Sequence, residues 1–238
     1  MLLFYIRHGD PIYNPDSLTP LGERQAEAVA RRLCLFGLDE IYASSSNRAQ
    51  LTAKPTCDIL KKEMQILDWC HESYAYQDMA FDNGMGRKEW VFRQKKYIEL
   101  FASDSIRALG NSWYDHPTLA DTTLKEGFLR IQTETDTFLS ALGYEHDHTN
   151  HYYHVREGHD RRVALFAHEG FGMAFLSAVL DIPYPVFSTH FDMTHSGMTV
   201  IDFTSMDGIC VPHMLQFSND SHIYKQDLPL HFQNRLRF

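Results

Sequence analysis

Short apolar runs alternate with amphipathic stretches along most of this 238-residue chain. The apolar runs have the length of β-strands, and the stretches between them carry apolar residues at helical spacing. Strands that alternate with helices build a mostly parallel sheet that is covered on both faces. The sequence therefore predicts an α/β fold, a three-layer sandwich with a mostly parallel central sheet flanked by helices.

The same spacing gives the positions of the expected elements. Strands are expected over residues 2–6, 40–43, 64–67, 162–167, 198–203 and 209–217. Helices are expected over residues 21–36, from the polar turn at 44–48 to about residue 62, and over 169–180. Thr19 is expected to cap the first helix and Pro20 to begin it, because threonine is a good N-cap and proline fits the first turn.

The segment between residues 73 and 160 departs from this alternation. It holds two expected helices, over 88–101 and 122–142, with no clear strand between them. Long segments inserted between the strands of a sheet often cover a functional site. We expect a helical cap insertion at about residues 73–160, within a single domain that spans residues 1–238. Arg93 and the nearby lysines are expected on a solvated helix face.

Composition argues against several classes of partner. The chain has 22 basic and 31 acidic residues, a net charge of -9 and no long block of like charge, which argues against nucleic acid. Its four cysteines are widely spaced, which favours reduced thiols over disulfides or a metal site. The N-terminal apolar run is too short for a membrane span or a signal peptide. We therefore expect a cytoplasmic protein with no membrane partner.

The tripeptide Arg7-His8-Gly9 directly follows the first expected strand. In α/β enzymes, side chains at the carboxyl ends of strands form the active site. A neighbouring arginine disfavours the protonated form of histidine, so a ring nitrogen of His8 stays available to attack an electrophile near neutral pH. The guanidinium group of Arg7 suits a phosphoryl group.

Two further strand ends carry residues of the same chemistry. The turn at 44–48 includes Arg48, and His168 follows the expected strand over 162–167. A parallel sheet would bring these ends to one edge, together with Arg7 and His8. Two histidines, two arginines and several helix N-termini would form a trap for an anionic phosphoryl group.

With these motifs the chain resembles the histidine phosphatase superfamily, which has the phosphoglycerate-mutase-like fold. The resemblance consists of four blocks in the family's order and covers most of the chain outside the insertion. The blocks are Arg7-His8-Gly9, residues 18–26, residues 44–49 with Thr52 and Ala53, and the strand that ends in Phe166-Ala167-His168.

The resemblance implies a role for each of these residues. His8 would be the nucleophile and form a phosphohistidine. Arg7, Arg48 and His168 would bind the phosphoryl oxygens. Asn14 lies where the family often places another phosphate contact, although an asparagine before a proline is also an ordinary turn residue. Fixed guanidinium and imidazole donors can stabilise the transferred group without a metal or another cofactor.

Phosphoryl transfer also needs a proton for the leaving oxygen and a base for the water that follows. One carboxyl group can serve both steps. Glu72 is the expected residue, because its distance from Arg48 resembles the family's spacing for this acid. Asp68 is the competitor, and a solvated loop position is the alternative for both carboxylates.

Three other features have more than one interpretation. Glu169, beside the expected trap, suits the first turn of a helix, but it could also tune substrate choice or donate a proton. His195, just before an expected strand, either approaches the pocket or belongs to an ordinary turn. The histidine-rich segment 146–154 suggests a metal site, but we expect a polar loop there.

These observations predict a metal-independent phosphatase that hydrolyses small phosphomonoesters through phosphohistidine. The main alternative is a phosphoglycerate mutase. Relatives of that type carry a tyrosine-glycine block after the acid and paired arginines in the insertion. Here Ser73-Tyr74-Ala75-Tyr76 follow Glu72, and the insertion has no adjacent arginine pair before Arg161-Arg162. A second alternative is a catalytically inactive module that binds phosphorylated ligands. The physiological substrate and the formation of a homo-oligomer stay open.

Overall fold

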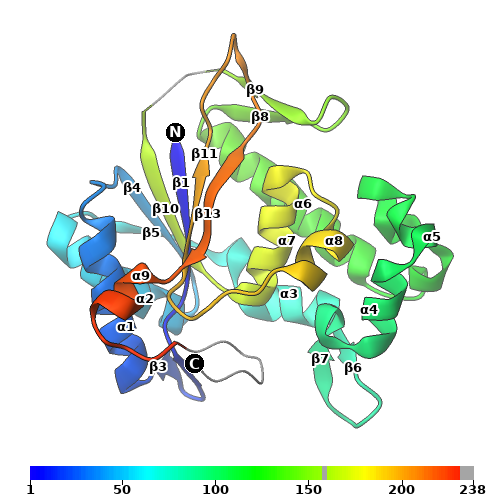
Figure 1. Ribbon diagram of the computed structural model, residues 1–238, viewed down its shortest axis with the longest axis horizontal. Coiled ribbons are helices and arrows are strands. Elements are labelled where there is room, and N and C mark those ends of the chain that lie inside the picture. Colours follow the sequence, from blue (N-terminus) through cyan, green and yellow to red (C-terminus); the bar gives the residue numbers. More distant parts are fainter. Residues whose placement is uncertain (157–159, 231–238) are drawn as a thin grey trace.

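A six-stranded, mostly parallel sheet forms the centre of the protein (Figure 1). The structure is a computed structural model that describes residues 1–156 and 160–230. From edge to edge, the sheet contains β13 (His213–Asn219), β11 (Met198–Asp202), β1 (Leu2–Arg7), β10 (Arg162–Ala167), β4 (Glu40–Ser44) and β5 (Met64–Leu67). β1, β10, β4 and β5 are parallel, whereas β11 runs antiparallel to β1 and to β13. The predicted α/β fold is confirmed.

Helices cover both faces of the sheet and complete the three predicted layers (Figure 1). One layer contains α1 (Pro20–Leu33), α2 (Asn47–Leu60) and α9 (Ser221–Lys225). The other contains α3 (Glu72–Met79), α6 (Leu124–Ala141), α7 (Glu169–Leu180) and α8 (Tyr184–His190). Side chains of alternate residues in β1 point toward opposite faces of the sheet, so they pack against the two different helix layers. Phe4 and Ile6 join the core beneath α1 and α2, whereas Tyr5 stacks on Phe175 of α7.

The helix boundaries follow the predicted capping residues. The Thr19 hydroxyl oxygen accepts a hydrogen bond of 3.1 Å from the backbone N–H of Gly22, as an N-cap does. α1 ends at Leu33, earlier than expected, because residues 34–36 continue only as a turn that leads to Gly37. α7 has the predicted bounds, and Asp181 ends it in the left-handed conformation.

The segment 73–160 contains a hairpin that its sequence did not reveal. Residues 88–101, expected as one helix, are divided into strand β7 (Lys88–Trp90), the 3-10 turn η2 (Val91–Arg93) and helix α4 (Lys95–Ala102). β7 pairs with β6 (Ala80–Asp82), and two glycines with positive φ, Gly84 and Gly86, lie in the turn between them. Arg93 therefore lies outside the helix, where it pairs with Glu169 instead of facing solvent.

A second small sheet changes two other expectations. It contains β12 (Ile209–Cys210), β9 (Tyr152–Val155) and β8 (Tyr144–Asp147) in that order. The histidine-rich segment 146–154, expected as a polar loop, thus belongs to the β8–β9 hairpin. The strand expected over 209–217 is divided into β12 and β13, because Pro212 between them lacks the N–H that a ladder needs.

The remaining elements are short. They are β2 (Pro11–Tyr13), β3 (Asp16–Leu18), η1 (Asp68–Cys70), α5 (Asp104–Arg107), η3 (Gly110–Asp115) and η4 (Pro117–Leu119). α4 and α5 lie beyond α8, at the side of the molecule away from the sheet (Figure 1). Among the described residues, no helix has the length and apolar character needed to cross a membrane.

Two glycines hold the loop that carries His8 against the start of α1. A Cβ atom added to Gly22 would lie 2.2 Å from the carbonyl oxygen of Asp10. A Cβ atom added to Gly9 would lie 2.6 Å from the carbonyl oxygen of Gly22. Because both obstacles are backbone atoms, neither can move aside as a flexible side chain would. This close approach fixes the backbone directly after His8.

We expect Gly22→Ala to lower the free energy of unfolding by about 1–3 kcal/mol, because the new methyl group forces the two backbones apart. Alanine would otherwise stabilise a helix relative to glycine, so the sign of the change is informative. Urea unfolding measures it. Arg24→Ala, at an exposed position of the same helix, is the control and should change stability by less than about 0.5 kcal/mol. A stabilised Gly22→Ala protein would contradict the contact.

Candidate active site

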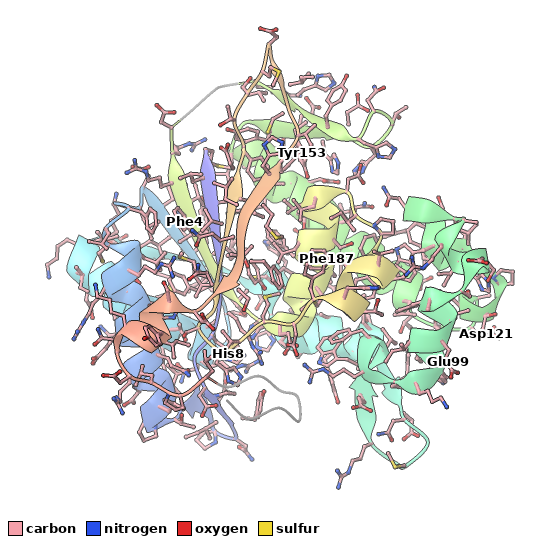
Figure 2. All side chains as sticks on the ribbon, viewed as in Figure 1. Phe4, His8, Glu99, Asp121, Tyr153 and Phe187 are labelled. Atoms are coloured by element: carbon pink, nitrogen blue, oxygen red, sulfur yellow. The ribbon has the colours of Figure 1, made fainter. Side chains whose placement is uncertain are left out.

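The carboxyl ends of three neighbouring strands bring the expected phosphate-binding residues together. His8 follows β1, His168 follows β10, and Arg48 lies in the first turn of α2, shortly after β4. β10 pairs with both β1 and β4, so the three ends are adjacent. The ring centroids of His8 and His168 are 5.2 Å apart. Figure 2 shows His8 at this end of the central sheet.

His8 is held as a neutral ring with one defined tautomer. Its Nδ1 lies 2.7 Å from the carbonyl oxygen of Gly9, which can only accept a hydrogen bond, so Nδ1 carries the proton. Burial holds the pKa of His8 well below its usual value, and the nearby cations Arg7 and Arg48 lower it further. At neutral pH, Nε2 therefore offers a lone pair in a cavity that His8 lines.

Arg7 is a buried cation whose outer nitrogens are all engaged. Its Nη1 donates to the carbonyl oxygen of Met193. Its Nη2 lies 3.1 Å from a carboxylate oxygen of Glu169 and 2.9 Å from Nε2 of His195. Its Nε is buried and has no hydrogen-bond partner within the described chain. An unsatisfied buried donor beside a cavity suits an anionic ligand.

Arg48 lines the cavity, whereas His168, which contacts Arg48, is fully buried and is not among the lining residues. Arg48 pairs through Nη1 with Asp16 at 2.8 Å and donates through Nη2 to Nδ1 of His168 at 3.1 Å. Because Nδ1 accepts, Nε2 of His168 carries the ring proton, and it lies 2.9 Å from the hydroxyl of Ser44. Burial, followed by the charge of Arg48, holds the pKa of His168 well below its usual value. His168 is thus a second neutral imidazole.

Glu72 lies at the start of α3, with its carboxylate against the N-terminus of α7. Its two oxygens accept hydrogen bonds from the backbone N–H groups of Gly170 and Phe171, at 3.0 and 2.9 Å. Burial raises the pKa of Glu72 above its ordinary value, although the Phe171 N–H and the charge of Arg48 oppose this shift. Burial thus makes Glu72 easier to protonate than an ordinary glutamate, while the helix N-terminus can stabilise the ionised form.

Asp68, the competing carboxylate, has a different environment. It accepts hydrogen bonds from the hydroxyl groups of Ser45 and Tyr74, which lower its pKa, and it lies at the surface. It is absent from the residues that line the cavity, whereas Glu72 is among them. Of the two carboxylates, Glu72 is therefore the one placed to exchange a proton with a bound molecule.

A cavity of about 380 Å³ lies in front of these groups. Polar and charged side chains form one part of its lining, and aromatic side chains form much of the rest. The lining residues are Arg7, His8, Tyr13, Arg48, His71, Glu72, Ser73, Tyr76, Trp90 and Glu169. Trp90 packs edge-on against Tyr76, with ring centroids 5.2 Å apart. A Cβ atom added to Gly170 would lie 2.1 Å from the Trp90 ring, so a glycine is needed for this close packing.

Comparison with known proteins agrees with this geometry. Residues 3–105 match the family model of the histidine phosphatase superfamily, branch 1. This part of the chain is similar to the histidine phosphatase superfamily, and it contains Arg7, His8, Arg48 and Glu72. No curated protein matches the chain.

Solved structures share the fold of this chain. A mutant phosphoserine phosphatase from Entamoeba histolytica, in complex with phosphoserine, is 19% identical with a TM-score of 0.59, and the match covers 93% of this chain and 98% of that chain. The mycobacterial glucosyl-3-phosphoglycerate phosphatase is 18% identical with a TM-score of 0.57, over 91% of this chain and 98% of that chain. At these identities the similarity establishes the histidine phosphatase fold.

Glu169 links the phosphate trap to a second arginine. One carboxylate oxygen pairs with Arg7 and the other with Nη2 of Arg93 at 2.5 Å. Burial alone would raise the pKa of Glu169, but the two arginines hold it below its ordinary value. Burial and the negative charge of Glu169 raise the pKa of the neighbouring Asp192 to about 6. Glu169 therefore holds Arg7 in place, in addition to lying in the first turn of α7.

His195 is a site residue that the sequence left unresolved. Its ring stacks on His8 with centroids 5.7 Å apart, and its Nε2 accepts from Arg7. Its Nδ1 lies 3.3 Å from a carboxylate oxygen of Asp10. The segment ahead of β11 reaches the site because β11 is antiparallel to β1, so that β11 begins where β1 ends.

Asn14 does not line the cavity within the described chain. It lies in the exposed turn between β2 and β3. The same hairpin serves the site through Asp16, which pairs with Arg48, and through Tyr13, whose ring lies 5.5 Å from the Arg48 guanidinium carbon. The hairpin therefore holds Arg48 in position, while the expected phosphate contact of Asn14 stays a prediction.

We expect the free energy of unfolding to fall as the pH drops below 6.5, the ordinary histidine pKa. In this range His8 and His168 bind protons in the unfolded chain but not in the folded one. Each can contribute up to about 1.4 kcal/mol for every pH unit below 6.5. Urea unfolding at a series of pH values should show a shallower fall for His8→Asn than for the parent protein. The exposed His190→Asn variant is the control, and equal slopes for all three proteins would contradict the buried neutral state of His8.

Proposed function

We propose that this protein is a phosphatase that hydrolyses small phosphomonoesters through a phosphohistidine intermediate on His8, without a metal ion. The observation that carries the proposal is the state of His8. Its Nδ1 proton is held by the carbonyl oxygen of Gly9, its ring is neutral, and Arg7 and Arg48 lie beside it. A neutral nucleophile next to fixed cations is what attack on a phosphoryl dianion requires.

In the first step, Nε2 of His8 attacks the phosphorus atom and the bond to the ester oxygen breaks. The guanidinium groups of Arg7 and Arg48 stabilise the phosphoryl oxygens, and His168 holds Arg48 through Nδ1. Glu72, whose pKa is raised by burial, gives its proton to the leaving oxygen. The Nδ1 proton stays on the ring, where Gly9 stabilises the charge of the phosphorylated imidazole.

In the second step, water attacks the phosphorus atom and the phosphorus–nitrogen bond breaks. Ionised Glu72 takes a proton from this water, which restores its acid form. Between the two steps, the backbone N–H groups of Gly170 and Phe171 hold the carboxylate. The bond to nitrogen returns its electron pair to Nε2, so His8 is again neutral when phosphate leaves.

The rest of the cavity favours hydrolysis over mutase chemistry. Within the described lining, the two guanidinium groups are Arg7 and Arg48, both assigned to the phosphoryl group. Tyr13, Tyr76 and Trp90 supply flat, uncharged surface for the remainder of the substrate. A mutase must hold a second anionic group of its substrate against release. The aromatic side chains of this cavity have no charge that could bind such a group. The solved relatives named as phosphatases point in the same direction.

The four cysteines are free thiols. Reduced cysteines are the rule in the cytoplasm, where thiol reductants keep them so. We place the enzyme there, as expected from its composition.

Brief reaction with labelled phosphomonoester, followed by denaturation, should trap an acid-labile phosphoryl group on the protein. His8→Ala should carry no label, because Nε2 is the acceptor. Absence of label on the parent protein would overturn the mechanism. Hydrolysis in the presence of a chelator should proceed at the parent rate, and a strict requirement for magnesium would contradict the metal-independent reaction.

Glu72→Gln should reduce hydrolysis of an alkyl phosphate by about 10²–10⁴-fold, because the leaving alkoxide loses its proton donor. The loss in the first step should be smaller with p-nitrophenyl phosphate, whose leaving group needs little protonation, so that phosphohistidine accumulates. Asp68→Asn is the matched control and should retain near-parent activity. The reverse result, with Asp68→Asn impaired and Glu72→Gln active, would assign the proton transfer to Asp68.

The mutase alternative is tested with 3-phosphoglycerate and a bisphosphate primer. We expect release of inorganic phosphate to exceed isomerisation. Isomerisation faster than all hydrolysis would establish a mutase instead.

A further inference from the structure

A cluster of histidine and aspartate side chains lies at the opposite end of the sheet from His8. It joins α6 to the β8–β9 hairpin and contains Asp136, His146 and His148. Tyr153, which stacks on His146 with ring centroids 4.2 Å apart, marks its place in Figure 2, far from His8. The cluster is therefore separate from the phosphate trap.

One ligand atom from each of the three side chains lies within 4.8 Å of the others. Nδ1 of His146 is 3.1 Å from one carboxylate oxygen of Asp136, and Nε2 of His148 is 2.8 Å from the other. Ligand atoms on one tetrahedral zinc ion lie about 3.3 Å apart, given bonds of about 2.0–2.1 Å to nitrogen and oxygen. The three side chains are thus already spaced close to a zinc geometry.

His146 is the least accessible member of the cluster. Only 1% of its side chain is exposed, and its second nitrogen, Nε2, is buried without a hydrogen-bond partner among the described residues. A carboxylate oxygen of Asp181 lies 3.9 Å from Nε2. Asp181 is itself held by His151 and by the side-chain amide of Asn111.

This arrangement matches the outer shell of a metal site. A histidine that binds a metal through one nitrogen commonly donates its other N–H to a carboxylate, which fixes the tautomer and the ring. The Asp181 carboxylate lies on the Nε2 side of His146, 3.9 Å away, and the Tyr153 ring stacks on the same imidazole. With the metal on Nδ1, Nε2 would carry the ring proton and face the Asp181 carboxylate.

We propose that Asp136, His146 and His148 bind a zinc-type divalent cation, with water completing the tetrahedral coordination. Two imidazoles and one carboxylate favour zinc over magnesium or calcium, which prefer oxygen ligands. The side chain of His148 is 45% exposed, so water can reach the fourth position. The ion fastens the β8–β9 hairpin to α6 and, through Asp181, to the C-terminal end of α7. The site is independent of the proposed phosphatase chemistry.

The test uses the full chain, stripped of metal with a chelator and titrated with zinc. We expect saturable uptake of one zinc ion per chain and a rise in the melting temperature of roughly 5–10 °C when free zinc is about 100 times its dissociation constant. Cobalt in place of zinc should give the visible absorption of a tetrahedral site. At 25 °C, removal of the ion should leave kcat/KM for p-nitrophenyl phosphate unchanged.

Asp136→Asn and His148→Ala should both lose zinc uptake and the thermal shift. His148 is half-exposed, so its replacement should not prevent folding, and circular dichroism checks this. His154→Ala is the matched control, because His154 is similarly exposed and pairs with Asp147 in the same hairpin. It should bind zinc like the parent protein.

His8→Ala separates the cluster from the phosphate trap, whose histidines are also zinc ligands in principle. We expect it to retain uptake. Uptake that survives in Asp136→Asn and His148→Ala but disappears in His8→Ala would place the ion in the active site and overturn the proposal. Absence of saturable uptake by the parent protein would show that the cluster is an ion-pair network alone.

Discussion

The active site depends on two arginine side chains that are buried at the carboxyl edge of the sheet. A buried cation is costly unless nearby groups compensate its charge. Glu169 compensates Arg7 and Asp16 compensates Arg48, each from a different segment of the chain. With their positions fixed, the two guanidinium groups help to keep His8 and His168 neutral. The same two arginines thus line the cavity and lower the pKa of both histidines.

Helix α7 positions several of the charged side chains described above. At its N-terminus, two backbone N–H groups hold Glu72, and its first residue, Glu169, holds Arg7. At its C-terminal end, Asp181 joins the histidine cluster. The helix is buried along nearly its whole length between the sheet and α6, so both ends are fixed by one rigid element. Its position therefore decides where the Glu72 carboxylate lies, as well as where the Arg7 guanidinium group lies.

Local sequence patterns predicted the helices and strands that have a capping residue or a regular hydrophobic spacing. The Thr19 cap, the strand before Arg7 and the bounds of α7 follow from capping and hydrophobic spacing, and all appear in the structure. The hairpin of β6 and β7 was missed because strands of three residues are too short to show a hydrophobic period. The prediction for Arg93 was wrong for the same reason. Arg93 was expected on a solvated helix face, but it lies in the turn η2 and pairs with Glu169.

The sequence by itself determined the fold class and the groups at three strand ends, because parallel strands must gather their carboxyl ends at one edge. It also favoured Glu72 over Asp68 as the proton donor, which stays a prediction; of the two carboxylates, Glu72 is the one that lines the cavity. Only the tertiary structure decided that His195 stacks on His8, because this requires β11 to run antiparallel to β1. Likewise, the tautomer of His8 and the protonation of Glu72 depend on burial and on hydrogen bonds whose partners, except for Gly9, lie far along the chain. Spacing within a sequence carries no information about such contacts until the chain is folded.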